Sequence, residues 1–289
     1  MSESTHNVDD RLDWDLTIRP ESGWFDLRLG ELWRYRDLIW LFVRRDFVVF
    51  YKQTILGPLW YLLQPLLTTI MMTIVFSRLA NISTDGVPPF LFYLSGTIAW
   101  SYFAQSLTQT SNTFISNASV FGKVYFPRMV VPVATVIIGF AQFGIQLALF
   151  LLVYAYYLLT GLAIDPSIWI LVLPVALLQM AMLGLGMGML VSSLTTKYRD
   201  LVFLMTFGVQ LWMYATPVVY PSSIVPESVR HLYMMNPMAS IVELFRFAFL
   251  GQGTIAIEYF AYSWISTLCV LFLGVVVFQR VERSFMDTV

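Results

Sequence analysis

The stretch RRDFVVFYKQTILGPLWYLLQPL, residues 44–66, joins a charged segment directly to an apolar one. Three cations and one aspartate fall within its first nine residues, and the 25 residues from 53 to 77 carry no charge. Gly57 and Pro58 stand near the junction, and proline is well placed in the first turn of a helix. The pattern predicts a helix that lies along a membrane surface and then turns into a helix that crosses the bilayer.

The composition extends this prediction to the whole chain. Of its 289 residues, 58% are hydrophobic and 12% are charged, and the mean hydropathy is +0.70. A soluble domain carries about 25% charged residues, so this chain has too few polar side chains to cover a soluble surface. The net charge of −1 indicates no nucleic-acid partner, and the single cysteine, Cys269, excludes a disulfide framework. We expect an integral membrane protein without a catalytic or metal site.

Six charge-free intervals are long enough to hold a transmembrane helix, which needs about 20 residues. They are 53–77, 86–122, 129–164, 166–196, 201–226 and 259–279. The second interval ends in a run of Ser, Thr, Asn and Gln, so its span is expected at about 89–113. The predicted fold class is an all-α integral membrane protein with six transmembrane helices in the segment 53–280.

The distribution of Lys and Arg predicts the orientation in the membrane. With the amino terminus in the cytoplasm, 14 of the 17 cations lie on the cytoplasmic side, and only Arg78, Arg230 and Arg246 lie outside. The opposite orientation would violate the positive-inside bias at every loop. The parts then expected in the cytoplasm are a polar tail at 1–28, an amphipathic interface helix at 29–52 and a carboxyl tail at 281–289.

The segment between the fifth and sixth intervals is not built like a span. Its pieces 222–235 and 238–250 are separated by Asn236 and Pro237, and both pieces contain charged residues. Apolar segments of about 10 to 14 residues are typical of re-entrant or interfacial helices. We predict two short gate helices that enter the membrane from its outer side, where their backbone must be buried in protein or line a wet cavity.

Two charged residues of the second gate helix stand three positions apart. Glu243 and Arg246 can pair on one helix face, and pairing lowers the cost of placing charges near the membrane. A structural ion pair is the simpler interpretation of this spacing, and a latch for the gate is the alternative.

The charged segment before the first span has the pattern of an amphipathic helix. With about 100° between successive residues, Arg34, Asp37, Arg44 and Arg45 fall within an arc of about 100°. Such a helix can anchor the first span to anionic lipid headgroups, or its charged face can dock a soluble partner. The residues alone favour the lipid anchor.

Several motifs of this chain closely resemble one family. They are TIRPESGW, LWRYRDLIWLFVRRDF, YKQTILGPLWYLLQPL, VYFPRMVVPVA and YATPVVYPSSIVPESVRHLYMMNPMASIVELFRFAFLG. From about residue 17 to 280, the chain is similar to the membrane subunits of type-2 ATP-binding-cassette exporters. It resembles in particular the branch that moves lipid-linked polysaccharides such as O-antigen, capsule and teichoic acid.

This resemblance implies a homodimer of six-span subunits that binds two copies of a separate cytoplasmic ATPase. MgATP is then held by the ATPase, and this chain accordingly lacks a Gly-x-x-x-x-Gly-Lys-Ser/Thr phosphate loop. The implied coupling segments are an interface helix at 31–45 and a coupling helix at 117–123. The ATPase-coupling residues that the resemblance implies are Glu31, Arg34, Asp37, Arg44, Arg45, Asn117, Val120, Phe121 and Lys123. The implied outer gate helices match about 222–250, with Tyr220, Pro226, Asn236, Pro237, Glu243 and Arg246 in the gate region.

A conduit for a polymer must hold sugar weakly at many places, and amides, hydroxyls and aromatic faces suit that task. The resemblance favours the first two spans as its lining. The lining residues expected there are Trp60, Tyr61, Gln64, Tyr93, Trp100, Tyr102, Phe103 and Gln105. Interfacial belts are the simpler role for the aromatic residues, and hydrogen bonds between helices are the simpler role for each glutamine. The other glutamines of the spans are Gln142, Gln146, Gln179 and Gln210.

The motif LGLGMGML places Gly184, Gly186 and Gly188 on one predicted span. Small residues four positions apart let transmembrane helices approach closely. We expect these glycines to serve helix packing.

The predicted function is transport, with no bond chemistry on this chain. Closure of the partner ATPases pushes on 31–45 and 117–123, and the first two spans separate across the dimer seam. A lipid-linked, O-antigen-like polysaccharide then moves outward across the inner membrane of a bacterium. The alternatives are an exporter of a small drug-like or lipid amphiphile, an intramembrane glycosyl- or acyltransferase, and a passive channel or assembly factor. No paired acids or Ser/His constellation in the spans supports the transferase.

Overall fold

Helices make up most of the chain in the computed structural model. The structure describes residues 29–52, 57–161, 166–198, 200–253 and 256–284, and these ranges contain no strand. The all-α prediction is confirmed for this part of the protein. The predicted tail at 1–28 and the last five residues of the predicted tail at 281–289 lie outside the described residues.

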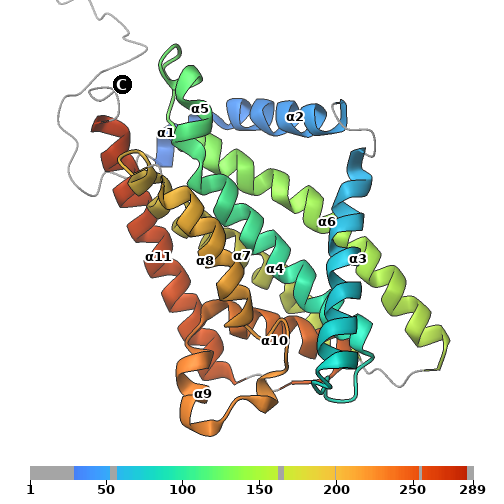
Figure 1. Cartoon of the computed structure of the whole chain (residues 1–289). Helices are drawn as coiled ribbons and strands as arrows, with labels where there is room; N and C mark the ends of the chain where they lie inside the picture. Colours follow the sequence, from blue (N-terminus) through green and yellow to red (C-terminus); the bar gives the residue numbers. More distant parts are fainter. Residues whose placement is uncertain (1–28, 53–56, 162–165, 199, 254–255, 285–289) are drawn as a thin grey trace, which may run out of the picture.

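The charged segment before the first span forms two helices at one end of the molecule. α1 covers Leu29–Arg34, and α2 covers Arg36–Lys52 and lies across the ends of the long helices (Figure 1). Phe42 is buried where α2 packs on α6 (Val130–Leu159), whereas the four charged side chains predicted to share one face are all exposed. The segment also exposes large apolar side chains, among them Trp40 and Leu41. The apolar face is used for packing within the chain.

The turn from α2 into the long helices requires a glycine. Gly57 has a φ of 49°, in the left-handed region that other residues rarely adopt. A 3-10 turn at Gly57–Leu59 leads into α3 (Trp60–Met72), which continues as a π-helical turn at Thr73–Leu79. Gly57 and Pro58 thus stand directly before α3, where the sequence predicted the start of the first span.

The remaining long helices run to and fro between the two ends of the molecule (Figure 1). They are α4 (Pro89–Ser111), α6, a 3-10 turn at Ile168–Val172 followed by α7 (Leu173–Thr195), α8 (Leu201–Tyr214) and α11 (Ile257–Ser284). Four segments in the described residues are long and apolar enough to cross a membrane. They are Trp60–Leu79, Val130–Leu159, Ile168–Thr195 and Ile257–Glu282.

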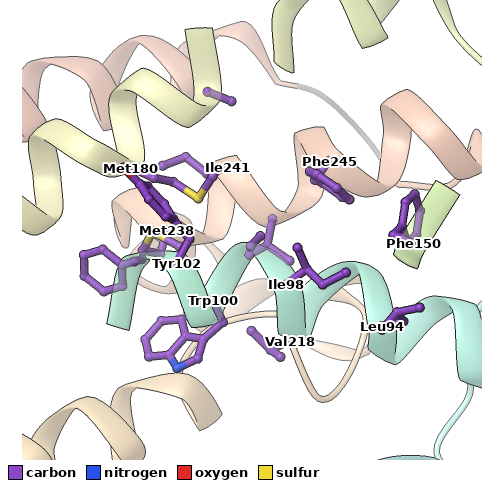
Figure 2. Packing of buried hydrophobic residues seen from close by; sticks show 14 of the residues in the cluster. Leu94, Ile98, Trp100, Tyr102, Phe150, Met180, Val218, Met238, Ile241 and Phe245 are labelled. Atoms are coloured by element: carbon purple, nitrogen blue, oxygen red, sulfur yellow. The ribbon is translucent and has the colours of Figure 1, made fainter. Parts of the chain in front are cut away.

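The helix α4 is the centre of the packing. Every residue from Leu91 to Trp100 is buried, and α3, α6, α7 and α10 (Pro237–Leu250) all pack on it. Figure 2 shows Leu94, Ile98 and Trp100 of α4 among apolar side chains of the neighbouring helices. Because protein rather than lipid surrounds α4, small polar residues such as Ser95 and Thr97 are tolerated within it.

Three glycines of α7 allow its closest contacts, as predicted. A methyl group on Gly184 would meet Ser106 Cβ at 2.8 Å, and one on Gly188 would meet the Leu107 carbonyl oxygen of α4 at 3.0 Å. On another side of α7, a methyl group on Gly186 would meet Leu271 Cα of α11 at 2.6 Å. Alternate glycines therefore pack α7 against α4 and against α11.

At the end opposite α2 the chain leaves the helical pattern. The 14 residues of α8 cover about 21 Å, less than the roughly 30 Å of a hydrocarbon core. Residues 215–226, named the strap here, then turn back into the molecule and include a 3-10 turn at Ser222–Ile224. The helices α9 (Glu227–Met234) and α10 follow (Figure 1). The span expected at 201–226 is therefore helical only over its first half.

Candidate functional site

Three segments far apart in sequence meet at the end of the molecule that carries α2. They enclose a pocket of about 400 Å³. Its walls are Glu31 and Leu32 of α1, residues 121–129 after α5 (Thr113–Phe121), and Gln279 and Glu282 of α11. The interface helix and the coupling segment predicted from the sequence thus lie side by side, and the end of α11 joins them.

A chain of phenylalanine rings connects these segments. Ring centroids are 5.8 Å apart between Phe42 and Phe126, and 5.7 Å apart between Phe126 and Phe121. They are 6.0 Å apart between Phe121 and Phe114, and 4.7 Å apart in the stacked pair of Phe114 and Phe278. All five rings are buried in one apolar cluster. This phenylalanine chain leads from α2 through the loop and α5 to α11, so a push on α2 or α5 meets a packed contact.

A buried arginine fastens the loop to α11. The backbone N–H of Arg128 donates to Glu282 Oε1 at 2.8 Å, and Arg128 Nη1 donates to the Glu282 carbonyl oxygen at 2.7 Å. The Arg128 guanidinium also lies over the ring of Phe121, 5.5 Å from its centroid. Burial lowers the pKa of Arg128, while the charges of Glu282 and Tyr125 raise it. These contacts hold the loop 122–127 in a fixed position beside the pocket.

The predicted coupling residues divide into an exposed set and a buried set. The exposed residues are Glu31, Arg34, Asp37, Arg44, Arg45 and Lys123. Phe121 is only 3% exposed and belongs to the phenylalanine chain, and Val120 packs against the same cluster. Asn117 Nδ2 donates to the Thr113 carbonyl oxygen at 3.0 Å, within its own helix. The helix expected at 117–123 lies at 113–121, so Val120 and Phe121 hold it in place while the residues after it face outward.

Two exposed apolar side chains of this loop were not among the predicted coupling residues. Tyr125 is 80% exposed and Val124 is 59% exposed, next to Lys123. The motif KVYFPR signalled this arrangement, because its two aromatic residues and two cations lie between two apolar helices. Arg128 and Glu282, which fasten the loop, were also not singled out.

The residues predicted to line a conduit are not together on one open surface. Tyr93, Trp100, Tyr102 and Phe103 of α4 are each at most 5% exposed and belong to the main core. Trp100 and Phe103 are covered by Trp212 of α8, with ring centroids 6.1 and 5.1 Å away. In this conformation these four rings are not accessible to a polymer. The lining prediction then rests on the exposed Trp60 and Gln64, and on the partly exposed Tyr61 and Gln105.

Some glutamines of the long helices form the predicted bonds between helices, and others face outward. Gln179 of α7 donates to Ser263 Oγ of α11 at 2.6 Å, and Gln142 of α6 donates to Tyr61 Oη of α3 at 2.5 Å. Gln146 is buried in α6. In contrast, Gln64 of α3 and Gln210 of α8 are exposed among apolar side chains.

The predicted gate region lies at the opposite end, around the strap. Asn236 caps α10, where its Oδ1 accepts a hydrogen bond from the Met238 N–H at 3.1 Å. Its Nδ2 donates to the Ala215 carbonyl oxygen and to Thr216 Oγ1 at 3.1 and 2.9 Å. Asn236 therefore joins the end of α8 to the start of α10, the helix that begins at Pro237. Of the other gate residues, Pro226 is exposed, and Tyr220 Oη donates to the Tyr214 carbonyl oxygen at 2.8 Å.

The predicted pairing of Glu243 with Arg246 is wrong for this conformation. Both side chains are buried, but Arg246 Nη2 donates to the Val218 carbonyl oxygen at 2.9 Å. The guanidinium lies over the Phe92 ring, 3.6 Å from its centroid, and its Nε and Nη1 have no hydrogen-bond partner. Glu243 Oε2 instead packs closely on Gly253, because a methyl group on that glycine would meet it at 2.7 Å. The arginine therefore bonds to the irregular backbone of the strap and not to Glu243.

A family model described as "ABC-2 type transporter" matches residues 37–250 of this chain. The chain belongs to the ABC-2 type transporter family. The ABC-2 match extends from α2 to the end of α10, so it includes the loop after α5 and the strap. The motifs that suggested a type-2 exporter are thus confirmed at the level of the family.

Curated relatives of this ABC-2 chain are permeases of polysaccharide export systems. The chain is 27% identical to an O-antigen export system permease protein RfbA of Klebsiella pneumoniae, over 87% of this chain and 94% of the relative. It is 28% identical to RfbA of Myxococcus xanthus, over 76% and 82% of the two chains. It is 24% identical to the capsule polysaccharide export inner-membrane protein CtrC of Neisseria meningitidis serogroup A, over 86% and 92%.

Proposed function

We propose that this chain is the membrane-spanning subunit of an ATP-driven exporter that moves a lipid-linked, O-antigen-like polysaccharide outward across a bacterial inner membrane. Two copies form the conduit, and two copies of a separate ATPase bind MgATP and hydrolyse it. The chain itself supplies a path and a mechanical link. The names of its relatives support the polysaccharide as the substrate class.

The observation that carries this proposal is the convergence of α1, the loop after α5 and the end of α11 around one pocket. A passive channel has no need for an exposed docking surface that is connected by packed rings to a transmembrane helix. An ATPase that closes on this surface would press on Glu31, Lys123 and Tyr125, all exposed, while the phenylalanine chain passes the displacement to α11. Packed interiors transmit such displacements because they resist compression.

The positions of the cations support an ATPase on this side. Lys123, Arg128, Lys197 and Arg280 lie on the loop or the helix ends that share the end of the molecule with α2 (Figure 1). Arg78, Arg230 and Arg246 lie on elements of the opposite end. An excess of Lys and Arg marks cytoplasmic loops, so the end with α2 is cytoplasmic in this proposal, and α9 and α10 are the outer gate helices. Six spans result if α4 and α8 also cross.

Two incompletely covered helices support a seam between two copies. In the segment Trp60–Leu79 only 17% of the apolar window is buried, less than in the other three candidate spans. Trp60, Gln64, Leu67 and Met71 share its exposed face, and Phe203, Phe207, Gln210 and Tyr214 share the exposed face of α8. A glutamine amide that faces hydrocarbon lacks hydrogen-bond partners, so these faces suit a wet conduit or a second copy better than lipid.

The test is to co-express the tagged chain with the ATPase encoded beside its gene, to purify the chain and to measure ATP hydrolysis. We expect co-purification, which the double substitution Lys123→Glu, Tyr125→Ala should reduce by at least about tenfold, since hot-spot aromatic residues contribute about 2 kcal/mol or more. Tyr198→Ala is the control, because Tyr198 is also exposed and lies in the connection between α7 and α8.

The outcomes separate this proposal from its alternatives. A folded chain that recruits no ATPase would contradict the proposal and favour a passive or enzymatic role. Equal losses in the Tyr198 control would mean that the pocket is not the docking site. If the complex forms and small amphiphiles stimulate hydrolysis while lipid-linked glycan does not, the substrate is a small amphiphile and not a polysaccharide.

A further inference from the structure

The strap is an irregular backbone segment buried within a helical membrane protein. Thr216, Val218 and Val219 are each at most 2% exposed. Peptide groups at such depth must find partners inside the protein. Some of them bond to nearby backbone, such as the Thr216 N–H to the Met213 carbonyl oxygen at 3.2 Å. Others bond to side chains of other elements, and these side chains therefore help to decide where the strap lies.

Several side-chain contacts fasten the strap along its length, among them a hydrogen bond between Glu243 and Ser222 of the strap. Asn236 holds its start through the bonds to Ala215 and Thr216. Arg246 holds its middle through the Val218 carbonyl oxygen. Asp85, in the loop between α3 and α4, holds its end by accepting a bond from Ser223 Oγ at 2.9 Å. The Arg246 contact uses a buried charge that has an opposite charge, Glu243, on its own helix.

The charge on Arg246 is incompletely satisfied where it lies. Two of its nitrogen atoms, Nε and Nη1, are buried without a hydrogen-bond partner. Glu243, three residues earlier on α10, is equally buried and is close enough to influence Arg246 through its charge. Residues three apart on a helix are neighbours, and a buried guanidinium paired with a carboxylate is far better satisfied than one bonded to a single carbonyl. The observed arrangement is thus one of two that the same side chains can adopt.

We propose that Arg246 and Glu243 are positioning residues of a latch on the strap. In the closed arrangement Arg246 holds the Val218 carbonyl oxygen, and in the open arrangement it exchanges that oxygen for the carboxylate of Glu243 and frees the strap. The latch rests on the proposed export function, since ATP-driven motion of α10 and α8 is what would trigger the exchange. Packing of Val218 and the contact of Arg246 with Phe92 favour the closed arrangement, while charge pairing favours the open one.

A buried reporter on the strap can follow this exchange. Val218→Cys, in a Cys269→Ser background that retains export, places a thiol at a fully buried position. The reagent is a membrane-impermeant maleimide applied to spheroplasts, first with a hydrolysis-deficient partner ATPase. We expect slow labelling of the parent. Arg246→Gln should raise the rate by at least about tenfold, since it removes a charged hydrogen bond, and Arg246→Lys should restore most of the protection.

A second variant opens the same latch without changing a charge. A methyl group on Gly96 would meet Arg246 Nη2 at 2.9 Å and Val218 Cα at 3.2 Å, so Gly96→Ala should also raise the resting rate. Gly144→Ala is its matched control, because a methyl group there meets nothing within 4 Å.

The substitution Glu243→Gln tests the exchange itself. It removes the charge that the open arrangement needs, keeps an amide oxygen that can still accept from Ser222, and does not alter the groups of the Val218 contact. With the active ATPase we expect labelling of the parent to accelerate, and we expect this acceleration to fall several-fold in Glu243→Gln with no change at rest. Glu227→Gln, at an exposed acid of α9, should behave like the parent.

The outcomes that overturn the latch differ from those that overturn the exporter. Resting protection that survives both Arg246→Gln and Gly96→Ala would show that Arg246 does not hold the strap. A resting rate raised by Glu243→Gln as much as by Arg246→Gln would make the two residues a static structural pair. If the ATPase does not assemble with the chain, the export proposal fails, and the resting comparisons still decide whether Arg246 holds the strap.

Discussion

At the scale of single residues, the glycines of α7 determine how closely the central helices approach. Thr110 and Leu107 of α4 lie so close to Gly188 that a methyl group would overlap the Thr110 side chain. Helix packing in a membrane depends on such close approach, because no hydrophobic effect draws apolar helices together there. A methyl group at this position therefore acts directly on the fold.

Gly188→Ala is expected to destabilise the protein by about 1 to 3 kcal/mol, the usual cost of overpacking a core. Gly144→Ala in α6 is the control, because the added methyl group meets open space and helix propensity improves by up to about 1 kcal/mol. Thermal unfolding of the purified chain in detergent should show a lower midpoint for the first variant only. Equal unfolding midpoints would mean that α4 and α7 can move apart without a loss of thermal stability.

Residue spacing predicted the role of these glycines correctly, but it did not predict the contacts of two charged side chains. A spacing of three on a helix allows Glu243 and Arg246 to pair, and nothing in the sequence reveals that Val218 brings a carbonyl oxygen to the same place. Likewise, the aromatic residues of α4 have the composition of a conduit lining, yet they are covered by α8 and α10. Local patterns report what a side chain can do, and tertiary packing determines which option is used.

At the scale of elements, hydropathy predicted helix positions well where a helix faces lipid or ends in a polar loop. The intervals 129–164, 166–196 and 259–279 contain or lie within helices whose bounds differ by a few residues. The interval 201–226 was misread beyond Tyr214, because the strap is as apolar as a helix while its backbone is irregular. Apolar composition reflects burial, and burial does not require a helix.

The loop after α5 links elements through Phe126, the ring between α2 and α5. Phe126→Ala should leave a cavity that costs about 3 to 5 kcal/mol, whereas Phe126→Leu should cost less than about 1.5 kcal/mol. We expect the alanine variant to bind the ATPase through its unchanged exposed loop and to hydrolyse ATP, but to export little polysaccharide. Export and hydrolysis, measured on the same membranes, should separate for alanine and stay together for leucine. Parallel loss of binding and hydrolysis would instead make Phe126 part of the docking surface.

At the scale of the whole molecule, the exposed faces of α3 and α8 require an explanation. The two helices pack on either side of α4 (Figure 1), and each presents a glutamine among large apolar side chains. In a two-fold dimer the same patch of each copy lies at the interface. If α3 of one copy contacts α8 of the partner, then α8 of that copy also contacts α3 of the partner. Lipid would satisfy the apolar side chains of this face but not the amides.

Cysteine crosslinking in the membrane can decide between the partner copy and lipid. In a Cys269→Ser background, we expect Gln64→Cys and Gln210→Cys, combined in one chain, to give disulfide-linked dimers under mild oxidation, because a disulfide needs Cβ atoms about 4 Å apart. Leu152→Cys on α6 is the control, since Leu152 is 70% exposed on a helix outside the predicted seam and should remain monomeric. If only the Leu152 variant crosslinks, the copies meet through α6 and the conduit cannot lie between α3 and α8. If the glutamine variants crosslink in a manner that depends on ATP hydrolysis by the partner, the seam itself moves during transport, which the opening of a path for a polymer requires.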